Sequence, residues 1–378
     1  MDNHELQLFR DSAQRLLRNE VLPHYDSWER AGITPRSLWN LLGDNGLLCV
    51  DLPPELGGSG VPLAYSQAVI EEVGQLGMAA LATNMVVHSD IVAHYLLHYG
   101  NEAQKQQWLP KMASGAAVGA IAMTEPGAGS DLQGMRTSAV RNDAGWLLNG
   151  SKTFITNGQH ADLVIVAAKS DPKQGGKGIS LFLVDTTLPG FERGRNLEKI
   201  GLHSGDTSEL FFNDLQIGAD ALLGELNQGF VYMMQQLPRE RLGVATAAIA
   251  AAEGALQWTC DYVKERQAFG KPISSLQNTR FKLAEAKTQI ALNKALLQQC
   301  IARYEAGELD VATAAMLKLA STEMQGKVID ECLQLFGGYG YMLEYPISRA
   351  YVDARVQRIY AGTSEIMKEI IARDLLGR

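Results

Sequence analysis

The period of the hydrophobic pattern changes twice along this chain, and this change restricts the fold more than any other feature. Up to about residue 120, apolar side chains recur at helical spacing, as in Leu6, Phe9 and Ala13. From there to about residue 225, short β-rich runs alternate with turn clusters such as NDAG and QGGKG. After Gly229 the helical spacing returns and no strand pattern interrupts it.

These three patterns predict an α+β multidomain protein. We expect a helical domain over 1–120, a small sandwich or barrel over 121–225 and a helical bundle over 226–378. The glycines at 337, 338 and 340 follow a helical pattern instead of a strand, so they do not indicate a doubly wound dinucleotide fold.

Composition and charge exclude several classes of protein. The chain has 378 residues, of which 46% are hydrophobic and 20% charged, which is typical of a folded chain with more than one core. A net charge of −8 argues against a nucleic-acid partner. Since no run of about 18 apolar residues occurs, we expect no membrane span.

The cysteine and histidine spacings predict neither a disulfide framework nor a metal site. The four cysteines lie far apart without a CxxC pair, which suits a reducing compartment. His94 and His98 are four residues apart, but no helical Glu-x-x-His pattern accompanies them, so we expect paired histidines and no metal. The first twenty residues lack a signal or transit pattern, and we expect a cytoplasmic location.

The sharpest motif is AMTEPGAGSD at 122–131. Gly127 and Gly129 allow a tight turn that exposes successive backbone N–H groups, and Ser130 adds a hydroxyl donor. Such a concavity suits an anion, although glycine-rich turns are more often only turns.

Five segments together resemble one family. AMTEPGAGSD, FITNG (154–158), ERQAFGK (265–271), QLFGGYGY (334–341) and YAGTSEIMKEIIAR (360–373) are similar, in order and spacing, to the motifs of the acyl-CoA dehydrogenase family, and the match spans essentially the whole chain. LPRERLGVA (237–245) and EYPISRAYVDARVQRIY (344–360) look most like the long-chain branch. The resemblance implies a helical N-terminal domain, a central β-barrel, a C-terminal four-helix bundle, and a homotetramer built as a dimer of dimers.

The resemblance also implies FAD as cofactor and a set of binding residues. One group would line the flavin: Ala122, Met123, Thr124 and Ser130 on one side, and Phe154, Ile155 and Thr156 on the other. A second group would reach the FAD of a neighbouring subunit: Arg266, Phe269, Gln277, Gln334, Gly337 and Gly338. Thr363 and Glu365 would close the site, while Ser130, Arg241 and Gly362 would contact the substrate.

The implied reaction is the oxidation of an acyl-CoA thioester to the trans-2-enoyl-CoA, the first step of β-oxidation. A carboxylate removes the α proton while the β hydrogen leaves as hydride to flavin N5. Most of the family carries the base directly before the Gly–Thr of the last motif, but here that position is Ala361. The long-chain branch places the base on another helix, which corresponds to Glu240 here. A backbone N–H at Glu240 or Ala361 would stabilise the enolate-like oxygen.

We expect Pro238 to begin the helix that carries Glu240, which would put Glu240 in its first turn. Arg239 and Arg241 would favour the ionised carboxylate, whereas burial would raise its pKa.

Three alternatives remain open at this point. A relative acting on a branched, terpenoid or carrier-protein-bound thioester would keep the same flavin motifs. An oxidase is the weaker enzyme alternative, since such enzymes are usually longer. A non-catalytic acyl-CoA-binding relic is favoured only by Ala361. For the dehydrogenase, the resemblance implies an electron-transferring flavoprotein as electron acceptor.

Overall fold

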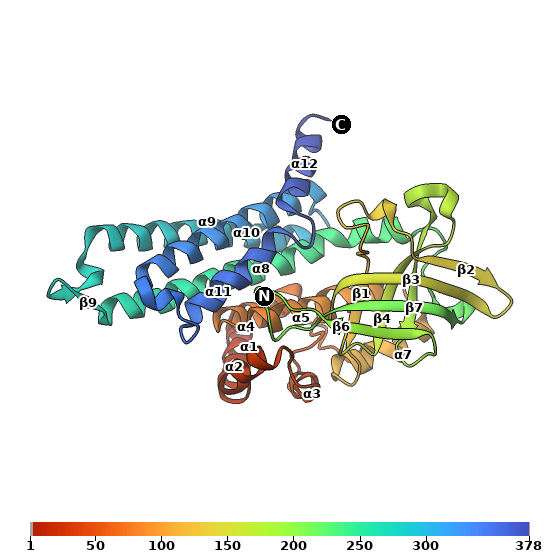
Figure 1. Ribbon diagram of the computed structural model, residues 1–378, viewed down its shortest axis with the longest axis horizontal. Coiled ribbons are helices and arrows are strands. Elements are labelled where there is room, and N and C mark those ends of the chain that lie inside the picture. The colour runs from red at the N-terminus through yellow and green to blue at the C-terminus, as the bar shows by residue number, and fades with distance from the viewer. Residues whose placement is uncertain (1–2, 378) are drawn as a thin grey trace.

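The computed structural model describes residues 3–377 and has a helical first part, a β-rich middle part and a helical last part, as predicted. Figure 1 shows the middle sheet at one end of the molecule and the long helices of the last part extending from it. The first part contains α1 (Asn3–Leu16), α2 (Leu22–Ala31), α3 (Ser37–Asp44), α4 (Leu63–Gln75), α5 (Ala79–Met85), α6 (Ala93–Tyr99) and α7 (Glu102–Ala113). A π-helical stretch, Val86–Val92, joins α5 to α6.

The middle part forms one sheet in the order β6-β7-β3-β2-β4-β5-β8, with β1 added parallel to β4. Its strands are β1 (Gly119–Ala122), β2 (Ser138–Asn142), β3 (Gly145–Thr156), β4 (Leu163–Lys169), β5 (Ile179–Asp185), β6 (Phe191–Asn196), β7 (Thr207–Ile217) and β8 (Leu222–Leu223). The β-rich runs of the sequence at 163–167, 179–184 and 210–212 lie within β4, β5 and β7.

Strand β4 is apolar on both faces because both faces are buried. Leu163 and Ile165 belong to the core shared with the first helical part, whereas Val164 and Val166 belong to the inner core of the sheet. Successive strand residues point to opposite faces, so a continuous apolar run is the pattern that such a strand requires. The sheet is thereby fixed firmly against the helices.

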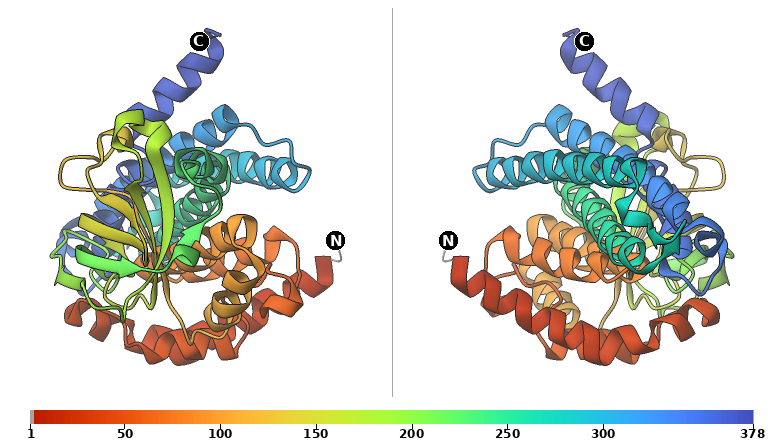
Figure 2. Two further views of the ribbon diagram at one scale, coloured as in Figure 1. Left: turned by 90° about the vertical axis from the view of Figure 1, so that its right-hand side faces the viewer. Right: turned by 90° about the vertical axis from the view of Figure 1, so that its left-hand side faces the viewer.

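The last part consists of α8 (Gly229–Glu265), α9 (Gln277–Glu305), α10 (Val311–Phe336), α11 (Pro346–Ala354) and α12 (Ser364–Leu375). Leu242, Ile290, Leu317 and Ile329 lie in one core between these helices. Figure 2 shows the long helices side by side, with α12 projecting away from them. The short strands β9 (Gln267–Ala268) and β10 (Lys271–Pro272) pair at the end of the bundle farthest from the sheet (Figure 1).

Helix α8 also packs closely against α4 of the first part. A Cβ atom at Gly254 would lie 2.4 Å from the carbonyl oxygen of Gln75, so the two helices cross at a distance that only glycine allows at this position. Helix α8 therefore joins all three parts of the molecule.

Candidate active site

A cavity of about 760 Å³ lies where the sheet, the beginning of α8 and the turn before α12 meet. Of the residues predicted to bind cofactor or substrate, it brings seven together: Thr124, Ser130, Phe154, Thr156, Arg241, Gly362 and Thr363. The lining also includes apolar side chains from α8 (Phe230, Met234 and Leu237) and from α12 (Ile366 and Ile370). Polar groups thus converge on a largely apolar cavity, as in a ligand site.

The loop that carries Ser130 is held by a buried ion pair. Nζ of Lys152 donates to the carbonyl oxygen of Met123 and to Oε1 of Glu125, both at 2.9 Å. The Glu125 carboxylate also accepts from the backbone N–H of Arg136 at 2.6 Å. Burial lowers the pKa of Lys152 to about 8, and the Glu125 charge opposes that shift. No atom lies within 4 Å of a Cβ placed on Gly127 or Gly129, so this glycine-rich backbone is open to a ligand.

Phe154 is turned into the cavity by an irregularity in β3. The register of β3 on β7 shifts between Lys152 and Ile155, and Phe154 has a φ of 59°. A bulge of this kind redirects one side chain, and 67% of Phe154 is exposed as a result. The neighbouring Ile155 points into the core of the sheet and is 3% exposed.

Three predicted flavin residues do not line the cavity with their side chains. Ala122 is fully buried, and Ile155 lies beside it in the core of the sheet. Met123 packs against the core of the first helical part.

Glu240 is not itself among the residues that line the cavity, but Leu237 and Arg241, its neighbours on α8, both line it. The residue is 6% exposed, and its Oε1 accepts a hydrogen bond from the hydroxyl of Tyr95 at 3.1 Å. Burial raises the pKa of Glu240 to about 7, while the Tyr95 hydrogen bond and the Arg241 charge act in the opposite direction. Burial therefore outweighs both, and the carboxyl exchanges its proton near neutral pH.

Two expectations about the surroundings of Glu240 were wrong. Helix α8 begins at Gly229 and Pro238 lies inside it, so Glu240 is not in a first turn. The residues before Pro238 continue the helix because they pack on the sheet and the first helical part, and this packing outweighs the cost of an internal proline.

Arg239 does not act on Glu240 either. Its Nη2 donates to Oδ2 of Asp51 at 2.6 Å and to Oδ1 of Asp90 at 2.9 Å. All three side chains are at most 7% exposed, and the guanidinium keeps the pKa of Asp51 below its usual value despite burial. Adjacent residues of a helix point about 100° apart, which is why Arg239 and Glu240 have separate partners.

Ala361 and Gly362 form the turn that lines the cavity before α12. Both have left-handed backbone, with φ of 49° and 87°, which is costly for alanine and typical of functional turns. Nζ of Lys318, a buried residue of α10, donates to the carbonyl oxygen of Gly362 at 2.7 Å. The hydroxyl of Thr363 caps α12 by accepting from the N–H of Ile366 at 3.3 Å. Glu365, in the first turn of α12, is exposed.

The second predicted group lies at the other end of the bundle. Arg266, Gln334, Gly337 and Gly338 line a cavity of about 550 Å³, and the nearby Phe269 is 92% exposed. Gln277 begins α9 and is also exposed. At 1.5 Å per helical residue, Arg266 lies roughly 40 Å along α8 from Glu240. One chain therefore does not bring the two groups together.

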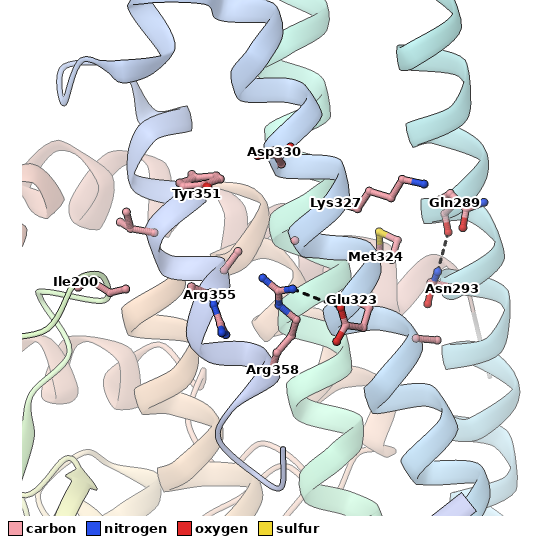
Figure 3. Close-up of a pocket in the computed structure, with 14 residues that line it drawn as sticks. Ile200, Gln289, Asn293, Glu323, Met324, Lys327, Asp330, Tyr351, Arg355 and Arg358 are labelled. Atoms are coloured by element: carbon pink, nitrogen blue, oxygen red, sulfur yellow. Dashed lines mark hydrogen bonds and ion pairs between the residues drawn. The ribbon is translucent and has the colours of Figure 1, made fainter. Parts of the chain in front are cut away.

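A third cavity, of about 840 Å³, was not predicted from the sequence. Figure 3 shows it between α9, α10 and α11, with Arg358 beside Glu323 and Arg355 on the other side of Arg358. Nη1 of Arg358 lies 3.4 Å from Oε2 of Glu323. Ile200 and Arg355 belong to the lining of both this cavity and the one beside Glu240, so the two are neighbours.

Tyr95 and Lys318 are two residues beside the cavity that the sequence analysis missed. Each lies in a helical pattern at a spacing that suits a core position, so no local signal distinguished them. The loop at 197–202, which also lines the cavity, carried no motif either.

Comparisons with known proteins agree with this architecture. Models of the acyl-CoA dehydrogenase N-terminal, middle and C-terminal domains match residues 3–116, 120–215 and 227–376. The chain belongs to the acyl-CoA dehydrogenase family. It is 48% identical over 374 residues to the mitochondrial long-chain specific acyl-CoA dehydrogenase of Sus scrofa, a match that covers 98% of this chain and 86% of that protein.

Solved structures of acyl-CoA dehydrogenases have the same fold. The Geobacillus kaustophilus acyl-CoA dehydrogenase is 49% identical, with a TM-score of 0.96 and 98% of each chain covered. A Mycobacterium smegmatis glutaryl-CoA dehydrogenase in complex with FADH2 is 29% identical, with a TM-score of 0.94, covering 100% of this chain and 96% of that one. The predicted family, fold class and oxidoreductase activity are thus confirmed, and the family is FAD-dependent.

Among residues 3–377, no helix is both long and apolar enough to cross a membrane, and no cluster of His, Cys, Asp and Glu is suited to a metal. His94 instead lies 3.1 Å from Asp51. Because the Sus scrofa relative is mitochondrial, the cytoplasmic location stays a prediction.

Proposed function

We propose that this protein oxidises a fatty acyl-CoA thioester to the trans-2-enoyl-CoA, with Glu240 as the base that removes the α proton. The single observation that supports this most is the burial of Glu240 beside the cavity, with a pKa raised to about 7. A general base works best when its pKa lies near the working pH. The position that holds the base in most of the family is Ala361, which cannot accept a proton.

The residues around the cavity fit a flavin. The hydroxyls of Thr124, Ser130 and Thr156 and the exposed ring of Phe154 all face one space, and the backbone at Gly127 and Gly129 is unobstructed. An aromatic ring suits the face of the flavin, and open N–H groups suit its pyrophosphate. When bound, FAD supplies the acceptor for the β hydrogen.

The chain's own backbone offers one donor for the thioester oxygen. The N–H of Glu240 lies inside α8, where a helix uses it for its own hydrogen bonds. Ala361 lies in a turn outside the helices. We therefore assign to the Ala361 N–H the stabilisation of the enolate-like oxygen.

We further propose a medium- or long-chain substrate, an electron-transferring flavoprotein as electron acceptor and a homotetramer as the assembly. The long-chain relative and the apolar lining from α8 and α12 support the substrate. The exposure of Leu375 (80%) and Leu376 (63%) on the projecting end of the chain supports an assembly that covers them.

An anaerobic titration of the purified yellow protein with saturated acyl-CoAs of increasing length tests the reaction. We expect long chains to bleach the flavin band in preference to short ones. Glu240→Gln should keep the flavin but lose at least about 100-fold in bleaching rate, as for removal of a general base. Glu253→Gln is the matched control, because Glu253 lies on the same helix but binds Lys294 and Gln75.

Three outcomes would contradict the proposal in different ways. Bleaching of Glu240→Gln at the wild-type rate would refute the base. A yellow protein that no fatty acyl-CoA bleaches would point to a branched, terpenoid or carrier-bound thioester. Protein that takes up no FAD would point to an acyl-CoA-binding relic.

A further inference from the structure

Tyr95 is the side chain that contacts the carboxyl of Glu240 directly. It comes from α6, in the first helical part, whereas Glu240 comes from α8 in the last part. Tyr95 is fully buried, and its hydroxyl donates to Oε1 of Glu240 at 3.1 Å. A buried tyrosine hydroxyl needs a partner, and here that partner is the proposed base.

We propose that Tyr95 is a positioning residue for Glu240: its hydroxyl fixes Oε1 and so leaves Oε2 to accept the α proton. This inference rests on the proposed function of Glu240. In the step it serves, the α C–H bond breaks, the proton goes to Oε2, and the electron pair stays on the substrate.

The ring of Tyr95 is itself held in place. It meets Tyr99 edge to face, with centroids 6.0 Å apart. Tyr99 stacks on Tyr232 of α8 at 4.0 Å, and its hydroxyl donates to Oε1 of Gln235 at 2.9 Å. Helices α6 and α8 are therefore also joined about one turn away from the Tyr95–Glu240 hydrogen bond, which restricts the direction of the Tyr95 hydroxyl.

The backbone of Glu240 is fixed independently. The preceding residue, Arg239, binds Asp51 and Asp90 in the first helical part, and its Nε donates to the carbonyl oxygen of Asp90 at 3.1 Å. Arg239 thus fixes the position of the Glu240 backbone, and Tyr95 fixes the position of the Glu240 carboxyl group. A base must be held to within about 0.5 Å, which two such contacts provide.

The charges and hydroxyls near Glu240 determine how the Tyr95 bond acts. Tyr95 and Tyr99 face it from α6, Arg241 from α8 itself, and Lys318 of α10 faces Arg241. Burial raises the pKa of Tyr95 well above its usual value, so its hydroxyl stays protonated and acts as a donor to the carboxylate. A donor stabilises the ionised base, whereas burial opposes ionisation.

The test compares Tyr95→Phe with Tyr65→Phe in the purified flavin-containing protein. Both changes remove one hydroxyl and keep the ring, but Tyr65 is a half-buried residue of α4 that packs on Phe9, and only the first change removes the hydrogen bond to Glu240. We expect Tyr95→Phe to retain flavin and KM, to slow anaerobic flavin reduction at neutral pH about tenfold or more, and to shift its pH dependence alkaline by about one to two pH units. Tyr65→Phe should match the wild type.

An infrared titration of the oxidised protein without substrate gives a second readout. The carboxyl band that Glu240→Gln abolishes should titrate at higher pH in Tyr95→Phe than in wild type. Identical infrared titrations, or the same pH–rate profile for both tyrosine variants, would overturn the positioning role. A wild-type protein that no acyl-CoA reduces would instead overturn the proposed function, since the infrared titration does not depend on it.

Discussion

The ammonium group of Lys318 donates a hydrogen bond to the carbonyl oxygen of Gly362 across 2.7 Å. Lys318 is fully buried in α10, and burial lowers its pKa to about 8. Its partner belongs to the turn in which Ala361 and Gly362 both have positive φ. A buried lysine of the bundle thus supports a strained turn in the cavity wall.

Lys318→Met should loosen this turn and leave the bundle folded. Methionine keeps an unbranched side chain but loses the donor, and a hydrogen bond from a charged group contributes about 1.5–3 kcal/mol. We expect FAD to bind at least about tenfold more weakly, as measured by the recovery of flavin fluorescence on dilution. The control is Lys327→Met, an exposed position on the same helix. Equal affinities in the two variants would show that the turn does not depend on Lys318.

The pKa of Glu240 sets the pH dependence of the reaction. Because burial raises it to about 7, the carboxyl holds its proton below that value and cannot accept another. The rate of flavin reduction by acyl-CoA should therefore rise with pH through about 7 and fall close to tenfold per unit below it. Stopped-flow measurements of kcat/KM against pH check this. A profile that is flat down to about pH 5 would mean that Glu240 has an ordinary pKa or is not the base.

Arg239 should matter for stability more than any exposed arginine. Arg239→Met leaves Asp51 and Asp90 buried without their cation, which costs about 3–5 kcal/mol when one partner of a buried pair is removed. Denaturant unfolding would measure this loss. Arg373→Met, at an exposed ion pair with Glu369, should change stability by less than about 1 kcal/mol. Similar losses for the two variants would contradict this account of the Arg239 cluster.

The sequence predicted the fold better than the surroundings of the base. Helical period identified the helices, whereas short length, β-rich composition and flanking turns identified strands such as β4, an apolar run buried on both faces. Pro238 misled the prediction of α8, because helix-start preferences are local while the packing that extends the helix to Gly229 is not.

The partners of Glu240 could not be predicted for the same reason. Neighbouring arginines looked equivalent in LPRERL, yet Arg239 binds Asp51 and Asp90 of distant elements. Tyr95 lies 145 positions before Glu240 in the chain and meets it only because α6 packs on α8. Motifs identify residues, whereas contacts between helices far apart in sequence decide the charge state of a base.

The distance between the two predicted cofactor groups leads to a last prediction. Arg266 lies roughly 40 Å along α8 from Glu240, so if both act on one FAD they must come from different chains. Glu240→Gln and Arg266→Ala should each impair turnover when expressed alone. Expressed together, they should form mixed dimers in which one site has an intact Glu240 from one chain and an intact Arg266 from the other.

If the chains assort at random around a two-fold axis, about half of the dimers are mixed, and each mixed dimer has one intact site out of two. The whole preparation should therefore recover about a quarter of the wild-type sites. Differently tagged variants, purified by both tags in sequence, would enrich the mixed species and raise the recovered activity. Glu240→Gln paired with Thr156→Val is the control. Both residues act from the same chain, so every site of a mixed dimer carries one of the two substitutions and no activity should return. Without recovery in the first pair, Arg266 would have no role at a neighbour's cofactor.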